Sequence, residues 1–563
     1  MTAPQERESA DLAAPLDQLL VEAATGPLRR FAPDASTAKF IGKLAANPVA
    51  TGRELGRLAT ELGRVVTGDS ELKPSRRDRR FVDPAWMVNP FLRRLVQSYL
   101  ATARTAEELV SVAELGWRDE RRMRFLIENL VEASAPSNVP LVNPASAKEA
   151  IDTGGASLLR GASTFLRDLR SPPRIPEMVD TSGFTVGGNI AVTPGAVVFR
   201  SEVLELIQYR PQTEQVREIP LLFVPPTINK FYAIDLAKGR SLVEYLVGTG
   251  QQVFVISWWN PDTRHRDWGM NTYVAAVREA MEAIRRVTGT ERLLLTGICA
   301  GGIIASITAT VLAGKGELDR LAGFSTFVTV LDTTKAGDPA ALGSRGIAAT
   351  AVALSKRRGY LDGRSLAEVF AWLRPGDLIW NYWVNNYLLG KKPPAFDILF
   401  WNADTTRMSA RLHADFVDIG VENRLSHPGS ISVDGVPIDL STVDVDAYVV
   451  AGIADHITPW QNCYLTTQML GGDSRFVLST SGHIAALVNP PTNRKATYQV
   501  NKKNPPDPQE WLRGATTEHG TWWPDYAGWL GERAGTERPA PTELGGGGLT
   551  PLADAPGTYV FDT

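Results

Sequence analysis

One stretch of the chain, residues 293–304, constrains the fold more than any other. An apolar run of strand length at 293–296 meets a cluster of glycines at positions 297, 301 and 302. A longer run of small and apolar residues follows and extends to Leu312. This pattern predicts a strand, a sharp turn and a helix, and Cys299 stands at the turn in the sequence G-x-C-x-G.

The G-x-C-x-G pattern is that of the nucleophile elbow of the α/β-hydrolase fold, with Cys in place of Ser. Glycines suit such a turn because the strand and the helix pack too closely there to leave room for a Cβ. Cys299 would then lie at a helix N-terminus, which favours a thiolate and a developing oxyanion. Two simpler interpretations are a small core cysteine and a membrane span over 293–314, although a glycine-rich break argues against the span.

Composition limits the class of protein. The chain has 563 residues, of which 44% are hydrophobic and 21% charged, as in a soluble globular protein with room for two domains. The net charge of −3 argues against a protein that binds nucleic acid through an overall positive charge. The two cysteines, Cys299 and Cys463, suggest a reducing compartment. The N-terminus shows no apolar signal core, so we expect a cytoplasmic protein.

The spacing of apolar residues along the sequence changes near residue 194. Before it the pattern is mainly helical, which predicts an N-terminal helical domain over 1–194, with residues 1–80 partly disordered. The amphipathic part of residues 1–80 either packs on its own domain or binds an apolar surface. After it short apolar runs alternate with helical patterns, which predicts a catalytic α/β domain over 195–563 with a mostly parallel sheet covered on both faces. These runs lie at 196–199, 203–209, 221–224, 253–257, 293–296, 324–331, 447–452 and 476–478.

The alternation of strands and helices stops between residues 333 and 443. This stretch is rich in Trp, Tyr, Phe and Asn, for example at 380–387 and 400–402. In an α/β-hydrolase it would be an insertion between core strands that forms a cap over the site. Its aromatic residues could line an acyl channel or form the cap's own core.

Three residues have the identity and order of a catalytic triad. Cys299, Asp455 and His483 follow one another as nucleophile, acid and base, which is the chain order of α/β-hydrolases, and each comes just after an apolar run. His483 would accept the thiol proton, and Asp455 would orient the imidazole and stabilise its charge. Taken singly, His483 could be an ordinary loop residue and Asp455 a helix cap. His456 is the alternative base.

An oxyanion hole requires two N–H donors. The first should be the N–H of Ala300, the residue after the nucleophile, and the second should come from the loop at 225–230. Two prolines in that loop have no N–H, which leaves Thr227 or Ile228, and we favour Ile228. An ordinary rigid turn would also explain the loop.

Together these motifs resemble those of the polyhydroxyalkanoate synthases, over nearly the whole chain from about residue 83 onwards. The lipase-like box around Cys299 is one of them, and the others are DPAW at 83–86, DTGGAS at 152–157, TPGAVVFR at 193–200, VPPTINK at 224–230, WNADTTR at 401–407 and SGH at 481–483. The stretches FAWLRP at 370–375 and NNYLLG at 385–390 are most similar to the class II enzymes, which prefer medium-chain substrates and act without a second synthase subunit.

The resemblance implies an acyltransferase that polymerises (R)-3-hydroxyacyl-CoA into a polyester and releases CoA through acyl-cysteine intermediates. It implies no cofactor beyond the coenzyme A of the substrate and no metal. The implied partners are the growing polyester chain, the granule surface, granule-associated proteins and a second copy in a homodimer, with a cytoplasmic location at granules. The alternatives are a thioesterase or polyester depolymerase with the same triad, and a non-catalytic granule protein on a hydrolase scaffold.

Overall fold

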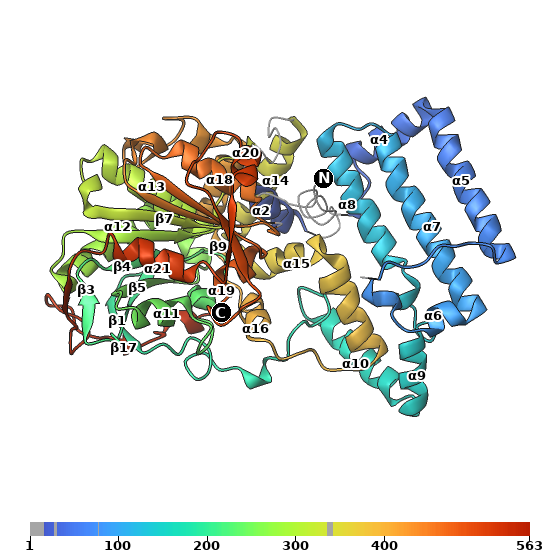
Figure 1. Cartoon of the computed structure of the whole chain (residues 1–563), viewed down its shortest axis with the longest axis horizontal. Coiled ribbons are helices and arrows are strands. Elements are labelled where there is room, and N and C mark those ends of the chain that lie inside the picture. The colour runs from blue at the N-terminus through green and yellow to red at the C-terminus, as the bar shows by residue number, and fades with distance from the viewer. Residues whose placement is uncertain (1–15, 27–30, 77, 335–341, 456) are drawn as a thin grey trace. The chain divides into compact units, whose positions relative to one another are not determined.

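The structure is a computed structural model and describes residues 16–26, 31–76, 78–334, 342–455 and 457–563. The chain divides into two compact units (Figure 1). The α/β unit comprises Met1–Thr25, Thr181–Leu366 and Asp397–Thr563, and the helical unit comprises Gly26–Asp180 and Ala367–Phe396.

The α/β unit is built on an eleven-stranded sheet with the strand order β15-β14-β13-β12-β7-β6-β4-β5-β2-β1-β17. The six central strands from β13 to β5 are parallel, and the strands on either side of them pair antiparallel. The strands are β1 (Gly195–Arg200), β2 (Leu204–Tyr209), β4 (Leu221–Val224), β5 (Val253–Trp258), β6 (Leu293–Ile298), β7 (Leu321–Phe327), β12 (Ala447–Gly452), β13 (Ser474–Ser479), β14 (Thr497–Val500), β15 (Thr516–His519) and β17 (Ala553–Asp554). All eight predicted apolar runs overlap strands of this sheet, so the prediction of a mostly parallel sheet is confirmed.

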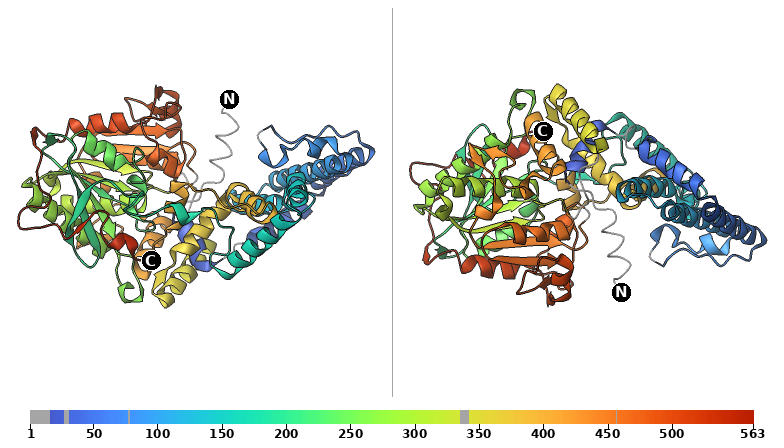
Figure 2. Two further views of the ribbon diagram at one scale, coloured as in Figure 1. Left: turned by 90° about the horizontal axis from the view of Figure 1, so that it is seen from below. Right: turned by 90° about the horizontal axis from the view of Figure 1, so that it is seen from above.

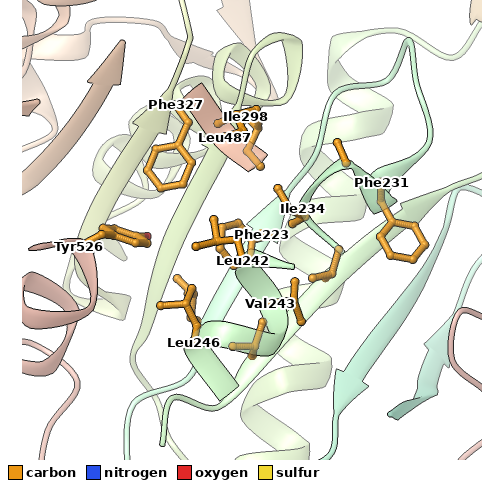
Figure 3. Packing of buried hydrophobic residues seen from close by; sticks show 14 of the residues in the cluster. Phe223, Phe231, Ile234, Leu242, Val243, Leu246, Ile298, Phe327, Leu487 and Tyr526 are labelled. Atoms are coloured by element: carbon orange, nitrogen blue, oxygen red, sulfur yellow. The ribbon is translucent and has the colours of Figure 1, made fainter. Parts of the chain in front are cut away.

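Both faces of the sheet are buried, as the alternation along β12 shows. Successive side chains of a strand point to opposite faces. Tyr448 and Val450 belong to one apolar cluster, together with residues of α11 (Leu242–Gly248) and α21 (Trp523–Gly531). Val449 and Ala451 belong to another, with residues of α18 (Trp460–Met469). Helices therefore cover both faces (Figures 1 and 2), and Figure 3 shows part of the larger cluster.

The remaining helices of the α/β unit lie between strands or around them. They are α2 (Leu16–Thr25), α12 (Met270–Thr288), α13 (Ala300–Gly314), α14 (Leu342–Arg358), α16 (Asp397–Ala403), α17 (Ala410–Val421), α19 (His483–Val488) and α20 (Pro508–Arg513). α12 has the predicted helical spacing, because Val274, Val277, Met281 and Ile284 are all buried along one side of it.

Three helices of the helical unit begin at an Asn-Pro pair. In each, the Asn side chain accepts hydrogen bonds from N–H groups of the first turn, and the Pro occupies the first helical position, where no N–H is needed. These helices are α5 (Pro48–Thr67), α7 (Pro90–Val112) and α9 (Pro144–Asp152). The unit also contains α4 (Ala35–Ala46), α6 (Ala85–Val88), α8 (Trp117–Ala133) and α10 (Ala156–Arg170).

The two compact units differ from the predicted domains 1–194 and 195–563 at three places. The boundary lies at Thr181 and not at residue 194. α2 groups with the α/β unit because it packs on α14 and α17, where the His413 ring contacts the Leu20 carbonyl oxygen at 3.3 Å. Residues 367–396 of the predicted cap group with the helical unit. There Phe165 of α10 packs edge-on against Trp383 and Tyr387, which joins the segment to α10.

The predicted cap at 333–443 lies between β7 and β12 in the chain, as an insertion between core strands should. Besides α14, α16 and α17 it contains α15 (Gly363–Leu373) and two π-helical segments, η8 (Gly376–Trp380) and η9 (Trp383–Leu388). Among the described residues, no helix combines the length and the apolar character needed to cross a bilayer.

Candidate active site

Cys299 occupies the predicted sharp turn between β6 and α13. Its backbone has φ 50° and ψ −120°, a conformation that a residue with a side chain rarely adopts. The Cys299 N–H donates to the Phe327 carbonyl at 2.9 Å, which ties the turn to the end of β7. The strained turn places Cys299 directly before the first helical residue, Ala300, as the G-x-C-x-G pattern predicts.

The glycines around Cys299 are required by close backbone packing. A Cβ on Gly301 would lie 2.3 Å from the Val224 carbonyl oxygen and 2.4 Å from that of Pro225. A Cβ on Gly297 would lie 2.5 Å from the Gly302 Cα. The helix can therefore approach the strands and the loop after β4 only because these positions have no side chain.

We expect Gly301→Ala to destabilise the protein by about 2 kcal/mol or more, because backbone atoms must move to admit the methyl group. The matched control is Gly528→Ala in α21, where a new Cβ would meet no heavy atom within 4 Å. The control should change stability by less than about 1 kcal/mol. Chemical unfolding of both variants tests this, and equal unfolding midpoints would contradict the packing argument.

Asp455 follows β12 and is buried in a shell of donors. Its Oδ1 accepts from the N–H groups of Ile457 at 2.8 Å and Thr458 at 2.9 Å, and its Oδ2 accepts from the Thr458 hydroxyl at 2.5 Å. Burial by itself would raise the pKa of Asp455, but the charge of His483 and these hydrogen bonds outweigh it and hold the pKa below 3.8. Asp455 is therefore a carboxylate at neutral pH.

His483 is the first residue of α19 and meets Asp455. Its Nδ1 lies 2.7 Å from the Asp455 Oδ2, and both side chains are buried. Burial would lower the pKa of His483, but the charge of Asp455 and its hydrogen bond raise the pKa well above 6.5, and the Cys299 side chain adds to this. The structure thus brings together Cys299, Asp455 and His483, which lie far apart in the sequence.

The other cysteine of the chain does not occupy an equivalent position. Cys463 lies in α18, fully buried in the apolar cluster on the opposite side of β12, and its thiol contacts the Thr458 carbonyl at 3.7 Å. Burial raises the pKa of Cys463 well above its usual value, which keeps the thiol protonated. His456, the alternative base, lies outside the described residues.

The loop at 225–230 is largely buried, and residues of the predicted cap donate hydrogen bonds to its carbonyl groups. The Ile228 carbonyl accepts from the Thr406 N–H at 3.3 Å, and the Thr227 carbonyl accepts from the Thr406 hydroxyl at 2.9 Å. The Trp401 indole of α16 donates to the Lys230 carbonyl at 2.8 Å. Ala300 and Ile228, the predicted oxyanion donors, therefore lie on α13 and on a loop that touches α13 at Gly301.

Cys299 itself is only 6% exposed and belongs to the same buried cluster as Trp401. Phe327 and Leu487 are further members of this cluster, and both are labelled in Figure 3. An aromatic residue of the segment predicted as a cap thus belongs to the same buried cluster as Cys299.

Thr458 is a site residue that sequence reasoning missed. Its N–H and hydroxyl both bind Asp455, and its Oγ1 also lies 3.2 Å from the Nδ1 of His483. A hydroxyl residue three positions after the candidate carboxylate is the local signal, because Asp and Thr at that spacing form a capping turn.

We expect Thr458→Val to lower kcat about tenfold, whereas Thr458→Ser should stay close to the wild type. The Thr458 hydroxyl helps to hold the pKa of Asp455 low, so its loss raises that pKa. Asp455 then loses its charge at a higher pH, and the acid limb of the pH–rate profile moves upwards. A Val variant with the wild-type profile would mean that Thr458 does not position Asp455.

Comparison with known proteins shows to which family the chain belongs. Residues 77–246 match the family described as the poly-beta-hydroxybutyrate polymerase (PhaC) N-terminus, and residues 231–490 match the α/β-hydrolase fold. The chain is 48% identical to "Poly(3-hydroxyalkanoate) polymerase 2" of Ectopseudomonas oleovorans over 92% of both chains. The chain belongs to the poly(3-hydroxyalkanoate) polymerase family.

Two further poly(3-hydroxyalkanoate) polymerases support the assignment. The chain is 44% identical to polymerase 1 of the same organism over 92% of both chains. It is 39% identical to the polymerase subunit PhaC of Cupriavidus necator, over 88% of this chain and 85% of that one. The chain is thus a polymerase of the acyltransferase type, and the predicted α/β-hydrolase fold with a preceding helical region is confirmed.

Proposed function

We propose that this polymerase joins (R)-3-hydroxyacyl units from their CoA thioesters through an acyl intermediate on Cys299. The observation that carries the proposal is the coincidence, in a member of this family, of a cysteine on a strained turn with a buried His–Asp pair. The reaction needs no cofactor beyond the coenzyme A that the substrate carries.

The acylation step requires a thiolate and a proton carrier. Because its pKa is raised, His483 holds the proton of Cys299 as an imidazolium, and the Cys299 thiolate attacks the carbonyl carbon of the acyl-CoA thioester. The oxyanion that forms is stabilised by the N–H of Ala300 and by that of Ile228. The bond between the carbonyl carbon and the CoA sulfur then breaks, and CoA leaves with the proton from His483. Asp455 stabilises the imidazolium in between.

The elongation step uses a hydroxyl as the nucleophile. The 3-hydroxyl of another unit loses its proton to His483 and attacks the carbonyl carbon of the chain held on Cys299. The ester bond forms as the carbon–sulfur bond to Cys299 breaks, and the thiolate is regenerated. Water would instead hydrolyse the intermediate, and the burial of Cys299 keeps water away from it.

A buried nucleophile requires opening before substrate can enter. We therefore expect alkylation of Cys299 by a bulky maleimide to be slow in the resting enzyme and at least about tenfold faster with detergent or a primer, since exposure of the thiol limits the reaction. A small reagent such as iodoacetamide is the control for intrinsic reactivity. Equally fast labelling by both reagents in buffer would show an open site and would favour a hydrolase.

Substrate length, assembly and location are also part of the proposal. The stretches at 370–375 and 385–390 support medium-chain substrates, since they are most similar to class II enzymes. Incubation with a mixture of short- and medium-chain 3-hydroxyacyl-CoA thioesters, followed by analysis of the polymer, tests this. The enzyme would act as a homodimer at the granule surface in the cytoplasm, where granule-associated proteins also bind.

The test of the proposed function measures CoA release and polymer mass in the same reaction. A polymerase releases one CoA for each unit found in polymer. Release of CoA with free 3-hydroxy acid as the product would instead support a thioesterase, and absence of both would support a non-catalytic granule protein.

A further inference from the structure

The segment 401–406 of the predicted cap lies antiparallel to the loop after β4. Asn229 of the loop pairs with Thr405 in an isolated antiparallel bridge. On one side of this pair, the Trp401 indole donates to the Lys230 carbonyl at 2.8 Å. The cap segment therefore binds the loop along its length and not at a single point.

On the other side of the bridge, Thr406 binds two successive carbonyl groups of the loop. Its hydroxyl donates to the Thr227 carbonyl at 2.9 Å, and its N–H donates to the Ile228 carbonyl at 3.3 Å. All three residues are buried, so little water competes for these hydrogen bonds.

The Thr227 carbonyl and the Ile228 N–H belong to the same peptide group. A trans peptide group is planar, so its C=O and its N–H point in opposite directions. Because the carbonyl accepts from the Thr406 hydroxyl, the Ile228 N–H points away from the cap segment. If this peptide turned over, a carbonyl oxygen would take the place of the N–H, and the oxyanion hole would lose a donor and gain an acceptor.

The Ile228 N–H is available to a bound substrate. Within the residues that the structure describes, no protein group accepts a hydrogen bond from it, although Ile228 is only 5% exposed. Buried N–H groups without a partner are rare in proteins and require an explanation. The other predicted donor is similar, because Ala300 is the first residue of α13 and its N–H has no partner within the helix.

A simpler role for Thr406 would be to anchor the loop. Other contacts already do this, since the Trp401 indole binds the Lys230 carbonyl and the Tyr232 hydroxyl donates to Asp404 at 2.6 Å. These contacts do not depend on which way the 227–228 peptide faces. The Thr406 hydroxyl adds a contact that does depend on it.

Thr406 is itself held in place by other parts of the α/β unit. The N–H of the next residue, Arg407, donates to the Asn260 side chain at 2.8 Å. A Cβ on Gly363 would lie 2.2 Å from the Thr406 carbonyl oxygen, so two backbone segments pack closely there. The position of the Thr406 hydroxyl is therefore fixed independently of the loop that it binds.

We propose that Thr406 is a positioning residue for the oxyanion hole. Its hydroxyl holds the 227–228 peptide so that the Ile228 N–H faces the acyl carbonyl at Cys299. The inference rests on the proposed function, in which an oxyanion forms on the acyl group that reacts with Cys299. It also links the cap to the chemistry, because movement of the cap segment away from the loop would release this peptide.

The test compares a reaction that forms an oxyanion with one that does not. Acylation of Cys299 by an acyl-CoA thioester forms an oxyanion, whereas iodoacetamide is attacked at a saturated carbon and loses iodide. Thr406→Val removes the hydroxyl and keeps the shape of the side chain. We expect single-turnover CoA release to fall at least about tenfold, while alkylation of Cys299 stays within about twofold of the wild type. Thr406→Ser, which keeps the hydroxyl, should acylate within about threefold of the wild type.

The matched control is Thr405→Val, at the neighbouring position. Thr405 binds the loop through its main chain, and its hydroxyl forms no hydrogen bond within the described part of the chain. This variant should therefore acylate and alkylate like the wild type.

The thioester formed on Cys299 gives a second measurement. An acyl-CoA without a 3-hydroxyl group leaves a thioester that cannot be elongated, and its carbonyl band can be recorded by infrared spectroscopy. The band should lie at a higher wavenumber in Thr406→Val than in the wild type, because the carbonyl oxygen accepts a weaker hydrogen bond.

Three results would overturn the inference. Equal CoA release by Thr406→Val and the wild type would show that the hydroxyl does not position the donor. An equal fall of acylation and alkylation in a folded Thr406→Val variant would show that Thr406 supports the site in general. Both results leave the proposed function intact, because the wild type still releases CoA. Absence of CoA release by the wild type would contradict the proposed function and, with it, this inference.

Discussion

Cys299→Ser is expected to lower polymerisation at least about 10³-fold, because a serine hydroxyl is far less acidic than a thiol and a poorer nucleophile for thioester exchange. The variant should fold normally, since the side chains differ little in size and the strained turn accepts either. The readouts are polymer mass and the single-turnover release of CoA. Half of the wild-type rate in the Ser variant would show that Cys299 is not the nucleophile.

The matched control for this experiment is Cys463→Ser. Cys463 is also buried, but it lies in the apolar cluster of α18, and its thiol donates to the Thr458 carbonyl. A serine hydroxyl can donate to that same carbonyl, so we expect activity within about twofold of the wild type. A large loss of activity in a folded Cys463→Ser variant would reveal a second role for this residue.

His483→Gln is expected to suppress acylation of Cys299 at least about 10³-fold, because no other group would then accept the thiol proton. Single-turnover CoA release measures this step without elongation. Asp455→Asn should impair elongation at least as much as acylation, since the carboxylate stabilises the imidazolium of His483 in any step whose rate depends on its formation. Normal acylation by His483→Gln would transfer the role of the base to His456.

Asp455→Asn should also change the pKa of His483, and the direction of the change follows from what sets that pKa. Burial lowers that pKa, and the charge of Asp455 is the largest influence that raises it. Asp455→Asn removes this charge and leaves the burial, so the pKa of His483 should fall, and the imidazole should be neutral at a lower pH than in the wild type. Titration of the imidazole signals by NMR measures the shift. An unchanged pKa would show that the two side chains do not interact in solution.

The same pair links stability to pH. The folded pKa of His483 is raised, so its contribution to stability is complete below about pH 6.5 and is lost as the pH rises through the folded pKa. The folded pKa of Asp455 is lowered, so its contribution is present above about pH 3.9 and is lost as the pH falls through the folded value. Stability should therefore decline on both sides of neutrality, and unfolding curves across pH for the wild type and Asp455→Asn test this.

The local pattern of the sequence was sufficient for the parallel sheet and for the turn at Cys299. Apolar runs at strand spacing predict buried strands because a parallel sheet is covered on both faces, and this requirement is local to each run. The glycines at 297 and 301 likewise predict that the backbones of neighbouring segments pack closely there. The chain order of Cys299, Asp455 and His483 predicted the meeting of the last two, whose atoms lie 2.7 Å apart.

Only the tertiary structure decided which distant segments pack together. The sequence placed residues 367–396 in a cap and the segment of α2 with the helical domain, but the contacts of Phe165 with Trp383 and Tyr387 and those of α2 with α14 and α17 group them otherwise. The contact of Thr458 with Asp455 and those of Arg358 and Arg407 with the Tyr360 ring also required coordinates. The physical reason is that periodicity reports whether a side chain is buried, whereas its partner across the fold is set by packing between elements far apart in the chain.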